Sequence, residues 1–463
     1  MVENNQETMV EQLADWVHDI DPSMLSDEAM EALKGRVLDA IGCAIGALEG
    51  PPIKNIRQLT DELGGNGHVT LIGGGKTTPH QASFYNGALV RYLDFNDSYL
   101  AKHETCHPSD NVAPVLAGAE YSHASGLEFL LALGIAYQVQ CRLSDIAPVR
   151  DHGFDHTVQG EYGAASGVAR ALGLDKDKIA NAVAIAGTGF NSLRVTRTGD
   201  LSNWKGLAYP NTAMGATFAG LLAQSGITGP REVFEGNKGF MDTIAGQFDI
   251  DWSKENMERV TNTIIKRFNA EIHSQASIEG LLELRDEIDV APEDIKHIYL
   301  ETFDVAYHII GGGEEGGKKN IRVKEEADHS LPYMLAAAYI DGNVMPEQYE
   351  PDRIASDDVQ QLLQKVDVTE NKTYSDRFPH EMACKITIET KDGQQYTIEK
   401  SDYEGFQTRP ASRETLMKKY HQLTKNIDPE LADAIADVIW NLETKNVSDL
   451  TNLLGKITIK DGE

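Results

Sequence analysis

The segment HETCHPSDN, residues 103–111, places two histidines, a cysteine, a glutamate and an aspartate within nine positions. It follows the stretch YLDFNDSY, which contributes Asp94 and Ser98. Histidine changes charge near neutral pH, and a carboxylate can accept or release a proton, so these side chains suit proton transfer. Three interpretations are open: a proton-transfer site, a metal site that uses His103 and His107, or a polar turn.

The metal interpretation is the least favoured of the three. His103 and His107 are four positions apart, but Pro108 interrupts the helix that would present both on one face. The sequence contains no HExxH, and no CxxC spacing occurs among its four cysteines, Cys43, Cys106, Cys141 and Cys384. We therefore expect neither a metal nor another cofactor.

Cations and further histidines occur in three later segments. His156, in GFDHT, precedes a small-residue helix whose N-terminus carries partial positive charge. Arg194, Arg197 and Lys205 gather around a glycine-containing helix break. Their chemistry suits the binding of carboxylates.

The last of these segments supplies Lys266 and His273, in IIKRFNAEIHSQ, at the expected junction of two domains. Tyr333, in ADHSLPY, is expected on the first turn of a helix. A substrate with several carboxylates would need such cations, because 72 acidic residues oppose 42 basic ones and leave a formal charge of −30. The same charge argues against nucleic acids and anionic membranes as partners.

The elements that must position these residues have two different textures along the chain. Apolar residues at helical spacing, with Ala- and Gly-rich faces, occur in segments 31–48, 83–93, 112–126, 161–174 and 214–226. Alternating patterns predict strands over 295–303, over 384–400 and in GKITIKDG near the C-terminus. Helical periodicity returns over 430–443, and we expect that helix to pack on the first domain.

We therefore predict a mainly α fold. A large all-α helical domain spans residues 1–268 and is completed by residues 408–463, and a smaller α+β lid domain spans residues 269–407. Asp94 and Ser98 are four positions apart and would share a helix face if the preceding helix continued that far.

Several other functions find no support in the sequence. GGGKTT, residues 73–78, resembles the end of a phosphate loop, but Thr70 stands where the first glycine is required. The N-terminal residues show no secretory signal, and the longest apolar run, residues 127–139, is shorter than the ~20 residues of a membrane span. We expect a cytoplasmic protein with no membrane partner.

Six segments in order resemble the 2-methylcitrate dehydratase and cis-aconitate decarboxylase family, MmgE/PrpD. They are RYLDFNDSY, HPSDN, GFDHT, NWKGLAYPNTA, KRFNAEIHSQ and ADHSLPY, and the likeness extends from about residue 8 to residue 450. The resemblance implies an all-α domain formed by both ends of the chain, an α+β lid between them, a homodimer, and no metal or organic cofactor.

The resemblance also implies a pocket for a tricarboxylate or dicarboxylate. Its candidate catalytic residues are Asp94, Ser98, His107, His156 and Tyr333, and its candidate substrate-binding residues are Lys205, Lys266, Arg194, Arg197 and His273. His107 or Asp94 is expected to be the base and His156 or Tyr333 the acid, whereas the lysines bind carboxylates. Ser98 replaces a threonine of the decarboxylases and keeps the hydroxyl.

The resemblance implies dehydration of 2-methylcitrate to 2-methylaconitate, with related hydration of citrate or aconitate. Decarboxylase-type members have a proline and a histidine where this chain has Asn269 and Glu271, and this difference favours the dehydratase branch. The alternatives are decarboxylation of cis-aconitate to itaconate and epimerisation of a dicarboxylate such as iminodisuccinate. A non-catalytic metabolite sensor is disfavoured, because the polar residues of the pocket are intact.

Overall fold

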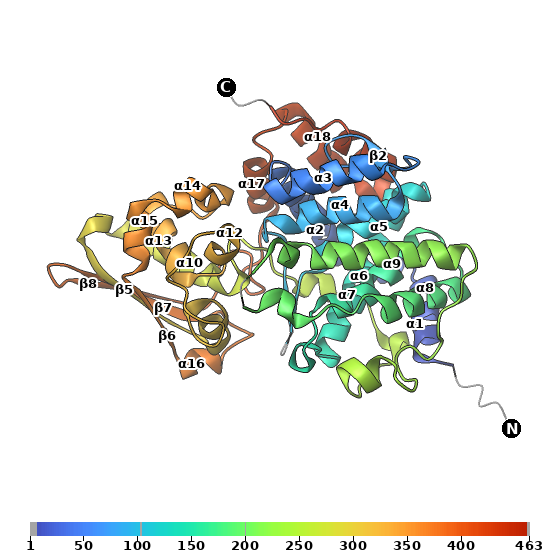
Figure 1. Cartoon of the computed structure of the whole chain (residues 1–463), viewed down its shortest axis with the longest axis horizontal. Helices are drawn as coiled ribbons and strands as arrows, with labels where there is room; N and C mark the ends of the chain where they lie inside the picture. The colour runs from blue at the N-terminus through green and yellow to red at the C-terminus, as the bar shows by residue number, and fades with distance from the viewer. Residues whose placement is uncertain (1–6, 102–103, 200, 461–463) are drawn as a thin grey trace. The chain divides into compact units, whose positions relative to one another are not determined.

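The computed structural model describes residues 7–101, 104–199 and 201–460. The chain divides into two compact units (Figure 1). Unit 1 contains Met1–Arg197, Trp204–Thr263 and Arg413–Glu463, and unit 2 contains Thr198–Asn203 and Ile264–Ser412. The predicted mainly α fold with a smaller α+β part is confirmed. The division predicted from the sequence, at 268/269 and 407/408, remains a prediction.

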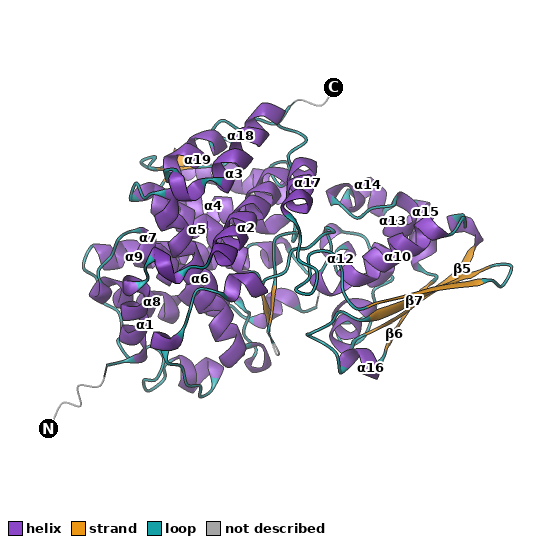
Figure 2. Ribbon diagram, turned by 180° about the vertical axis from the view of Figure 1, so that it is seen from behind, coloured by secondary structure: helices purple, strands orange, loops and turns teal. Residues whose placement is uncertain are grey.

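Helices, coloured purple in Figure 2, make up most of unit 1. The two longest in the described part of this unit are α2 (Asp27–Gly46) and α6 (Gly126–Ile146). The remaining helices are α1 (Met9–Asp19), α3 (Pro51–Leu63), α4 (Pro79–Tyr92), α5 (Val112–Tyr121), α7 (Thr157–Ala171), α8 (Lys176–Gly189), α9 (Ala208–Gln224), α17 (Arg413–Leu423), α18 (Pro429–Trp440) and α19 (Val447–Leu454).

Polar side chains cap the starts of the two longest helices of unit 1. The Ser26 hydroxyl accepts a hydrogen bond from the Ala29 amide at 3.0 Å, and Ser125 accepts one from the Glu128 amide at 3.2 Å. Each cap satisfies a backbone donor that the helix itself cannot pair, which stabilises a helix by about 0.5–2 kcal/mol. Local sequence therefore determines where these helices begin.

Glycine permits the close contact between α6 and α7. A Cβ atom on Gly163 would lie 2.7 Å from the carbonyl oxygen of Ala136, and one on Gly167 would lie 2.8 Å from that of Ala132. Neither distance leaves room for a side chain. The Ala- and Gly-rich helix faces therefore act as predicted, because they let backbones approach closely.

The C-terminal helices belong to unit 1, although 149 residues of unit 2 precede them in a continuous stretch, Ile264–Ser412. Both α17 and α18 pack against α2, and α19 packs against α5. The predicted strand in GKITIKDG is wrong for its described part: the chain there forms no strand. Instead, the Ile457 amide bonds to Leu454 O and the Lys460 amide to Asn426 O, so the alternating pattern has no partner strand.

Unit 2 contains a four-stranded sheet with the order β6-β5-β7-β8. β5 (Ile295–Thr302) is parallel to β6 (Val366–Glu370) and antiparallel to β7 (Cys384–Thr390), which forms a hairpin with β8 (Gln395–Lys400). The strands predicted over 295–303 and 384–400 are therefore confirmed. α10 (Gln275–Glu287) contacts β7 and β8, and α13 (Leu331–Asp341) contacts β6.

The remaining helices of unit 2 are short: α11 (Asp304–Ala306), α12 (Lys324–Ala327), α14 (Pro351–Ile354), α15 (Asp357–Leu363) and α16 (Lys372–Ser375). Two small hairpins belong to unit 1. β1 (Val69–Thr70) pairs with β2 (Lys76–Thr77), and β3 (Tyr99–Leu100) pairs with β4 (Thr105–Cys106). No helix in the described part of the chain is long and apolar enough to cross a membrane.

Candidate active site

Asp94 lies just beyond the C-terminus of α4, in a backbone conformation that is unusual for its residue type. Its φ is +53°, in the left-handed region that residues other than glycine adopt at a cost. The helix ends at Tyr92, so Asp94 and Ser98 do not share a helix face. The buried carboxylate lies 2.6 Å from Arg91 Nη1 and 3.4 Å from Lys205 Nζ. Asp94 thus connects two cations.

His107 follows the β3–β4 hairpin and precedes the short 3-10 turn Pro108–Asn111. Its Nδ1 lies 2.8 Å from the carbonyl oxygen of Asp97 and 3.1 Å from Ser98 Oγ. A carbonyl oxygen can only accept a hydrogen bond, so Nδ1 carries a proton. His103, the other residue of the metal hypothesis, lies outside the described residues.

The Asp97 side chain fixes the loop that carries His107. Its carboxylate accepts hydrogen bonds from the Ser109 amide at 3.0 Å and from the Tyr137 hydroxyl at 2.9 Å. Burial raises the pKa of Asp97, although Arg36 and the hydrogen bonds oppose this shift. The network joins helix α6, through Tyr137, to the backbone on both sides of the β3–β4 hairpin.

His156 stands at the N-terminus of α7, next to Asp155 in the sequence. Burial is the main reason that its pKa falls to about 3; Asp155 opposes the shift, whereas Arg197 and Arg91 add to it. His156 is therefore neutral near pH 7. A histidine that adds positive charge to a pocket must be an imidazolium, so the neutral His156 does not serve as a cation. Its ring can still form a hydrogen bond.

The two histidines lie close together despite their separation in the sequence. The ring centroids of His107 and His156 are 5.5 Å apart, in an edge-to-face arrangement. Hydrogen bonds link the imidazole pair to the Asp94 ion group. Arg91 donates to both Asp94 and Asn96, Asn96 donates to Ser109, and the Ser109 amide donates to Asp97, whose carbonyl oxygen accepts from His107. The structure thus brings together five of the predicted residues, Asp94, Ser98, His107, His156 and Lys205.

The two predicted arginines have different surroundings. Arg197 Nε donates to Asp155 at 2.5 Å, and Asp155 Oδ1 lies 3.3 Å from His156 Nδ1, so Arg197 orients the acid beside His156. This contact argues against a direct role for Arg197 in substrate binding. Burial and the nearby Arg150 lower the pKa of Arg194, which also lies close to Asp155.

In unit 2, Lys266 and His273 are both almost fully buried, at 1% and 3% exposure. His273 Nδ1 lies 2.7 Å from Glu271 Oε1. Burial alone would raise the pKa of Glu271, but His273, His329 and Lys266 lower it to about 2. Unit 2 thus contributes an imidazole–carboxylate pair with a lysine near it.

Tyr333 lies on the first turn of α13, as predicted, and the Ser330 hydroxyl caps this helix. Its hydroxyl donates a hydrogen bond to the backbone carbonyl of Gln348. Burial raises the pKa of Tyr333. Both observations argue against Tyr333 as the acid of the reaction, because its proton is engaged and held more tightly than usual.

Sequence reasoning gave no organising role to three residues that hold these groups in place. Arg91 contacts Asp94, Asp155 links Arg197 to His156, and Glu271 holds His273. A signal existed in each case, because an ionisable residue stands one to three positions from its predicted partner. Arg91 lies in the last turn of α4 and Asp94 just beyond its end, so their contact does not follow from helix spacing.

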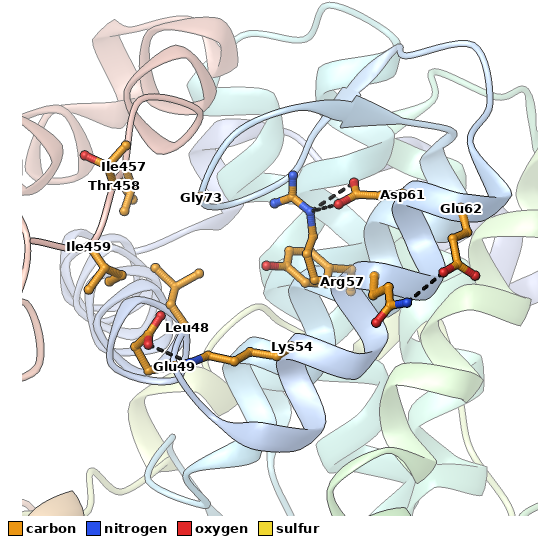
Figure 3. A pocket seen from close by; sticks show the side chains of 12 residues that line it. Leu48, Glu49, Lys54, Arg57, Asp61, Glu62, Gly73, Ile457, Thr458 and Ile459 are labelled. Carbon is orange, nitrogen blue, oxygen red and sulfur yellow. Dashed lines mark hydrogen bonds and ion pairs between the residues drawn. The ribbon is translucent and has the colours of Figure 1, made fainter. Parts of the chain in front are cut away.

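A separate pocket of about 770 Å³ lies in unit 1 beside α3 and the C-terminal residues 457–459 (Figure 3). Its charged side chains pair with one another: Arg57 bonds Asp61 at 2.9 Å and Lys54 bonds Glu49 at 2.7 Å. Three acidic residues and two basic ones line the pocket, and no predicted site residue is among them. It therefore does not offer a cationic surface for a tricarboxylate.

Residues 11–253 match the MmgE/PrpD N-terminal domain, and residues 268–444 match the MmgE/PrpD C-terminal domain. Because the two matches cover most of the chain, the protein belongs to the MmgE/PrpD family. The resemblance predicted from the six sequence segments is confirmed.

Relatives of two activities are similar to this chain. The 2-methylcitrate dehydratase of Escherichia coli (strain K12) is 30% identical over 395 residues, 78% of this chain and 78% of the relative. The cis-aconitate decarboxylase of Mus musculus is 25% identical over 485 residues, 98% of this chain and 95% of the relative. That of Homo sapiens is 26% identical over 479 residues, 96% and 94% of the two chains.

Proposed function

We propose that the protein is a hydro-lyase that removes water from 2-methylcitrate to form 2-methylaconitate. Membership of the MmgE/PrpD family supports an enzyme that acts on a small organic acid with several carboxylates. The observation that carries the proposal is the His107–His156 pair beside the Asp94, Arg91 and Lys205 ion group. This arrangement combines proton transfer with carboxylate binding.

His107 is the base in this proposal, rather than Asp94. The Nδ1 proton of His107 is directed to the Asp97 carbonyl, so Nε2 is the nitrogen proposed to take the proton next to a carboxylate of the substrate. The Asp94 charge is already shared between Arg91 and Lys205, which makes its carboxylate a weaker base. Asp94 instead holds these cations in place.

His156 acts in the proposal as a neutral hydrogen-bonding group. Its low pKa of about 3 keeps the ring uncharged, and a neutral imidazole can still polarise a substrate oxygen. Lys205 and Lys266 are proposed to bind carboxylates, whose charge a protein at −30 would otherwise repel. Arg194 is retained as a further candidate for carboxylate binding.

Decarboxylation of cis-aconitate is the second candidate, because the decarboxylases match a larger part of this chain than the E. coli dehydratase does. Asn269 and Glu271 favour the dehydratase, since they replace the proline and histidine of the decarboxylase pattern. Epimerisation of a dicarboxylate such as iminodisuccinate would use the same types of group.

The test is a substrate panel. The purified protein is incubated with 2-methylcitrate, citrate, cis-aconitate and iminodisuccinate, and products are identified by NMR and by released CO₂. We expect 2-methylaconitate from 2-methylcitrate and no CO₂. Itaconate as the main product would overturn the dehydratase proposal in favour of decarboxylation.

The role of His107 is tested in the same assay. His107→Asn should lower kcat by about 10²–10⁴ and change KM little, since it removes a proton acceptor. His421→Asn is the control, because His421 is a half-exposed histidine of unit 1 that faces Asp433 on the surface. An unchanged kcat in His107→Asn would exclude His107 as the base.

We further propose that the protein is a homodimer, which the resemblance to the family supports. Light scattering coupled to size-exclusion chromatography tests the oligomeric state: twice the mass of the 50.8 kDa chain is expected, and the mass of one chain would contradict the proposal.

A further inference from the structure

Helix α9 packs on α7 and between α4 and α8, all in unit 1 (Figure 1). The buried hydroxyls of Ser83 and Thr217 form a hydrogen bond of 2.8 Å that joins α4 to α9. The Gly229 amide donates to the side-chain oxygen of Asn181 at 3.1 Å, which joins the segment after α9 to α8. These contacts hold three sides of α9, and its fourth side is open to solvent.

The solvent-facing side of α9 is apolar. Phe218 is 48% exposed, and Met214 and Leu222, about one turn to either side of it, are half-buried. Residues four apart lie on one side of a helix, so these side chains form a stripe. The His80 ring of α4 lies 5.3 Å from the Phe218 ring, and Ile227, whose amide bonds to the Leu222 carbonyl, is 50% exposed. We call these five residues the α9 face.

Charged residues are missing from the segments that form and border the α9 face. Residues 77–90, 179–193 and 206–230 contain no Asp, Glu, Lys or Arg, although such residues make up 25% of the chain. Burial accounts for part of this, since charged side chains are rarely buried. It does not account for Gln224, Ser225 and Thr228, which are exposed and could carry a charge without cost. The lack of charge is therefore a property of this surface as well as of the core.

Helix α3 shows an ordinary surface helix of the same unit. Leu59 of α3 is 52% exposed, slightly more than Phe218. Lys54, Asp61 and Glu62 lie on the same helix, so Leu59 is an isolated apolar side chain among charges. Such side chains are common on protein surfaces and require no partner. Leu59 therefore provides a matched control for Phe218.

The overall charge restricts the partner that the α9 face can bind. Two chains with a formal charge of −30 each repel one another, so they can associate only where few like charges meet. In a two-fold contact the same patch lies on both sides, and an uncharged apolar patch is complementary to itself. A basic partner would instead bind the acidic remainder of the surface. The charges thus favour a second copy of this chain.

We propose that the α9 face is the contact surface of the homodimer, with Phe218 at its centre. The inference rests on the proposed homodimer and specifies where the two chains meet. Stable interfaces use about 20–30 residues on each side, and their cores are depleted of charge and rely on a few residues, often aromatic ones. Three neighbouring helices can supply such an area, and Phe218 supplies an exposed aromatic side chain.

The first test is Phe218→Glu, which would place one carboxylate from each chain in an apolar contact. The dimer Kd should rise by at least about 30-fold, as expected at an energetically dominant residue. Light scattering coupled to size-exclusion chromatography should then give the mass of one chain, 50.8 kDa, at a concentration where the unsubstituted protein has twice that mass. A folded Phe218→Glu variant with an unchanged dimer Kd would overturn the proposal.

Phe218→Ala keeps the test valid if the glutamate disturbs folding, because alanine adds no charge and favours a helix. Its dimer Kd should rise by at least about tenfold, and circular dichroism establishes that the variant is folded. Leu59→Glu is the control, since it adds the same charge at similar exposure on α3. Its Kd should equal that of the unsubstituted protein. A similar loss of the dimer in Leu59→Glu would contradict a contact centred on Phe218.

Salt dependence separates an apolar contact from one that ion pairs hold together. The Debye length falls from about 10 Å at ~0.1 M salt to about 3 Å at ~1 M, which screens the repulsion between two acidic chains. The α9 face has no carboxylate or ammonium group, and burial lowers the pKa of His80, which keeps its ring neutral near pH 8. The dimer Kd, measured by analytical ultracentrifugation, should therefore fall with KCl or stay constant. A Kd that rises with KCl would overturn the proposal.

Failure of this proposal can be told apart from failure of the others. The mass measurements need no substrate, so their outcome leaves the dehydratase proposal untouched. If the unsubstituted protein has the mass of one chain, the homodimer and its contact surface are both wrong. If it has twice that mass and both Phe218 variants keep the same Kd, the homodimer stands and only the α9 face is wrong.

Discussion

Asp94 combines a strained backbone with a carboxylate that contacts two cations. Its left-handed φ of +53° is a conformation in which helices commonly place glycine just after they end. An aspartate there indicates that the side chain is needed, and its contacts with Arg91 and Lys205 give the reason. Backbone strain and site chemistry thus coincide at one residue.

A pair of substitutions separates these two effects. Asp94→Gly and Asp94→Ala both remove the carboxylate, but only glycine adopts a positive φ without steric cost. We expect Asp94→Ala to be less stable than Asp94→Gly by about 1 kcal/mol in urea unfolding, with activity lost in both. Equal stability of the two variants would mean that the left-handed backbone is not the native one.

Buried acids near His107 should make stability depend on pH. Burial raises the pKa of Glu104 to about 7, although Arg194 and Arg150 oppose the shift. Above its ordinary pKa of 4.5, the unfolded chain has released this proton while the folded protein still binds it. The folded state therefore loses stability as pH rises from about 4.5 to about 7.

Glu104→Gln removes this loss of stability. In the native protein, Glu104 Oε2 accepts a hydrogen bond from the Arg150 amide at 3.2 Å, and the glutamine side chain keeps an oxygen that can accept it. Between pH 5 and pH 8, the free energy of unfolding of the variant should fall by roughly 1–3 kcal/mol less than that of the unsubstituted protein. Urea unfolding at both pH values measures the difference. Parallel behaviour of the two proteins would show that Glu104 is ionised throughout.

At the scale of elements, helix packing determines where His156 stands. α7 begins directly after His156 and lies against α6 through Gly163 and Gly167. Tyr137, in α6, donates a hydrogen bond to the carboxylate of Asp97, and the Asp97 carbonyl accepts one from His107. A shift between these two helices would therefore move the two imidazoles relative to each other.

Gly163→Ala tests this coupling. Its new methyl group would lie 2.7 Å from the Ala136 carbonyl oxygen, so we expect a loss of about 1–3 kcal/mol in unfolding free energy and a lower kcat. Gly189→Ala in α8 is the matched control, since no atom lies within 4 Å of its added Cβ. That variant should be as stable as the native protein or slightly more stable. If Gly163→Ala kept the unfolding free energy and the kcat of the unsubstituted protein, α6 and α7 would be able to move apart without cost.

At the scale of the whole molecule, periodicity was sufficient to predict helices α2, α4, α5, α7, α9 and α18 and strands β5, β7 and β8, because both patterns are local. Strand β6 and the other helices were not predicted in this way. Contacts that complete the site are not local. Arg197 meets Asp155, which is 42 positions away, so its pairing could not be read from the helix break around it. The wrong strand near the C-terminus has the same cause, because an alternating pattern does not specify a partner.

The sequence likewise predicted which residues form the site better than it predicted their protonation and their hydrogen bonds. The types of His107, His156 and Lys205 pointed to proton transfer and carboxylate binding, and the structure places them in one group. The neutral state of His156 and the hydrogen bond of the Tyr333 hydroxyl depend on burial and on neighbours from other elements. Such states follow from tertiary packing and not from spacing.

The net charge of −30 yields a last prediction, because it acts on substrate encounter over a longer range than the local cations do. At ~10 mM salt the Debye length is about 30 Å, so an anionic substrate is repelled by the negative charge of the whole surface. At ~100 mM salt the Debye length is about 10 Å, so the attraction of Lys205 and Arg91 dominates. We therefore expect kcat/KM for 2-methylcitrate to rise with KCl between these concentrations, while kcat at saturation stays nearly constant. A kcat/KM that falls steadily with salt would mean that the local cations already attract the substrate at long range, so that the overall negative charge does not limit binding.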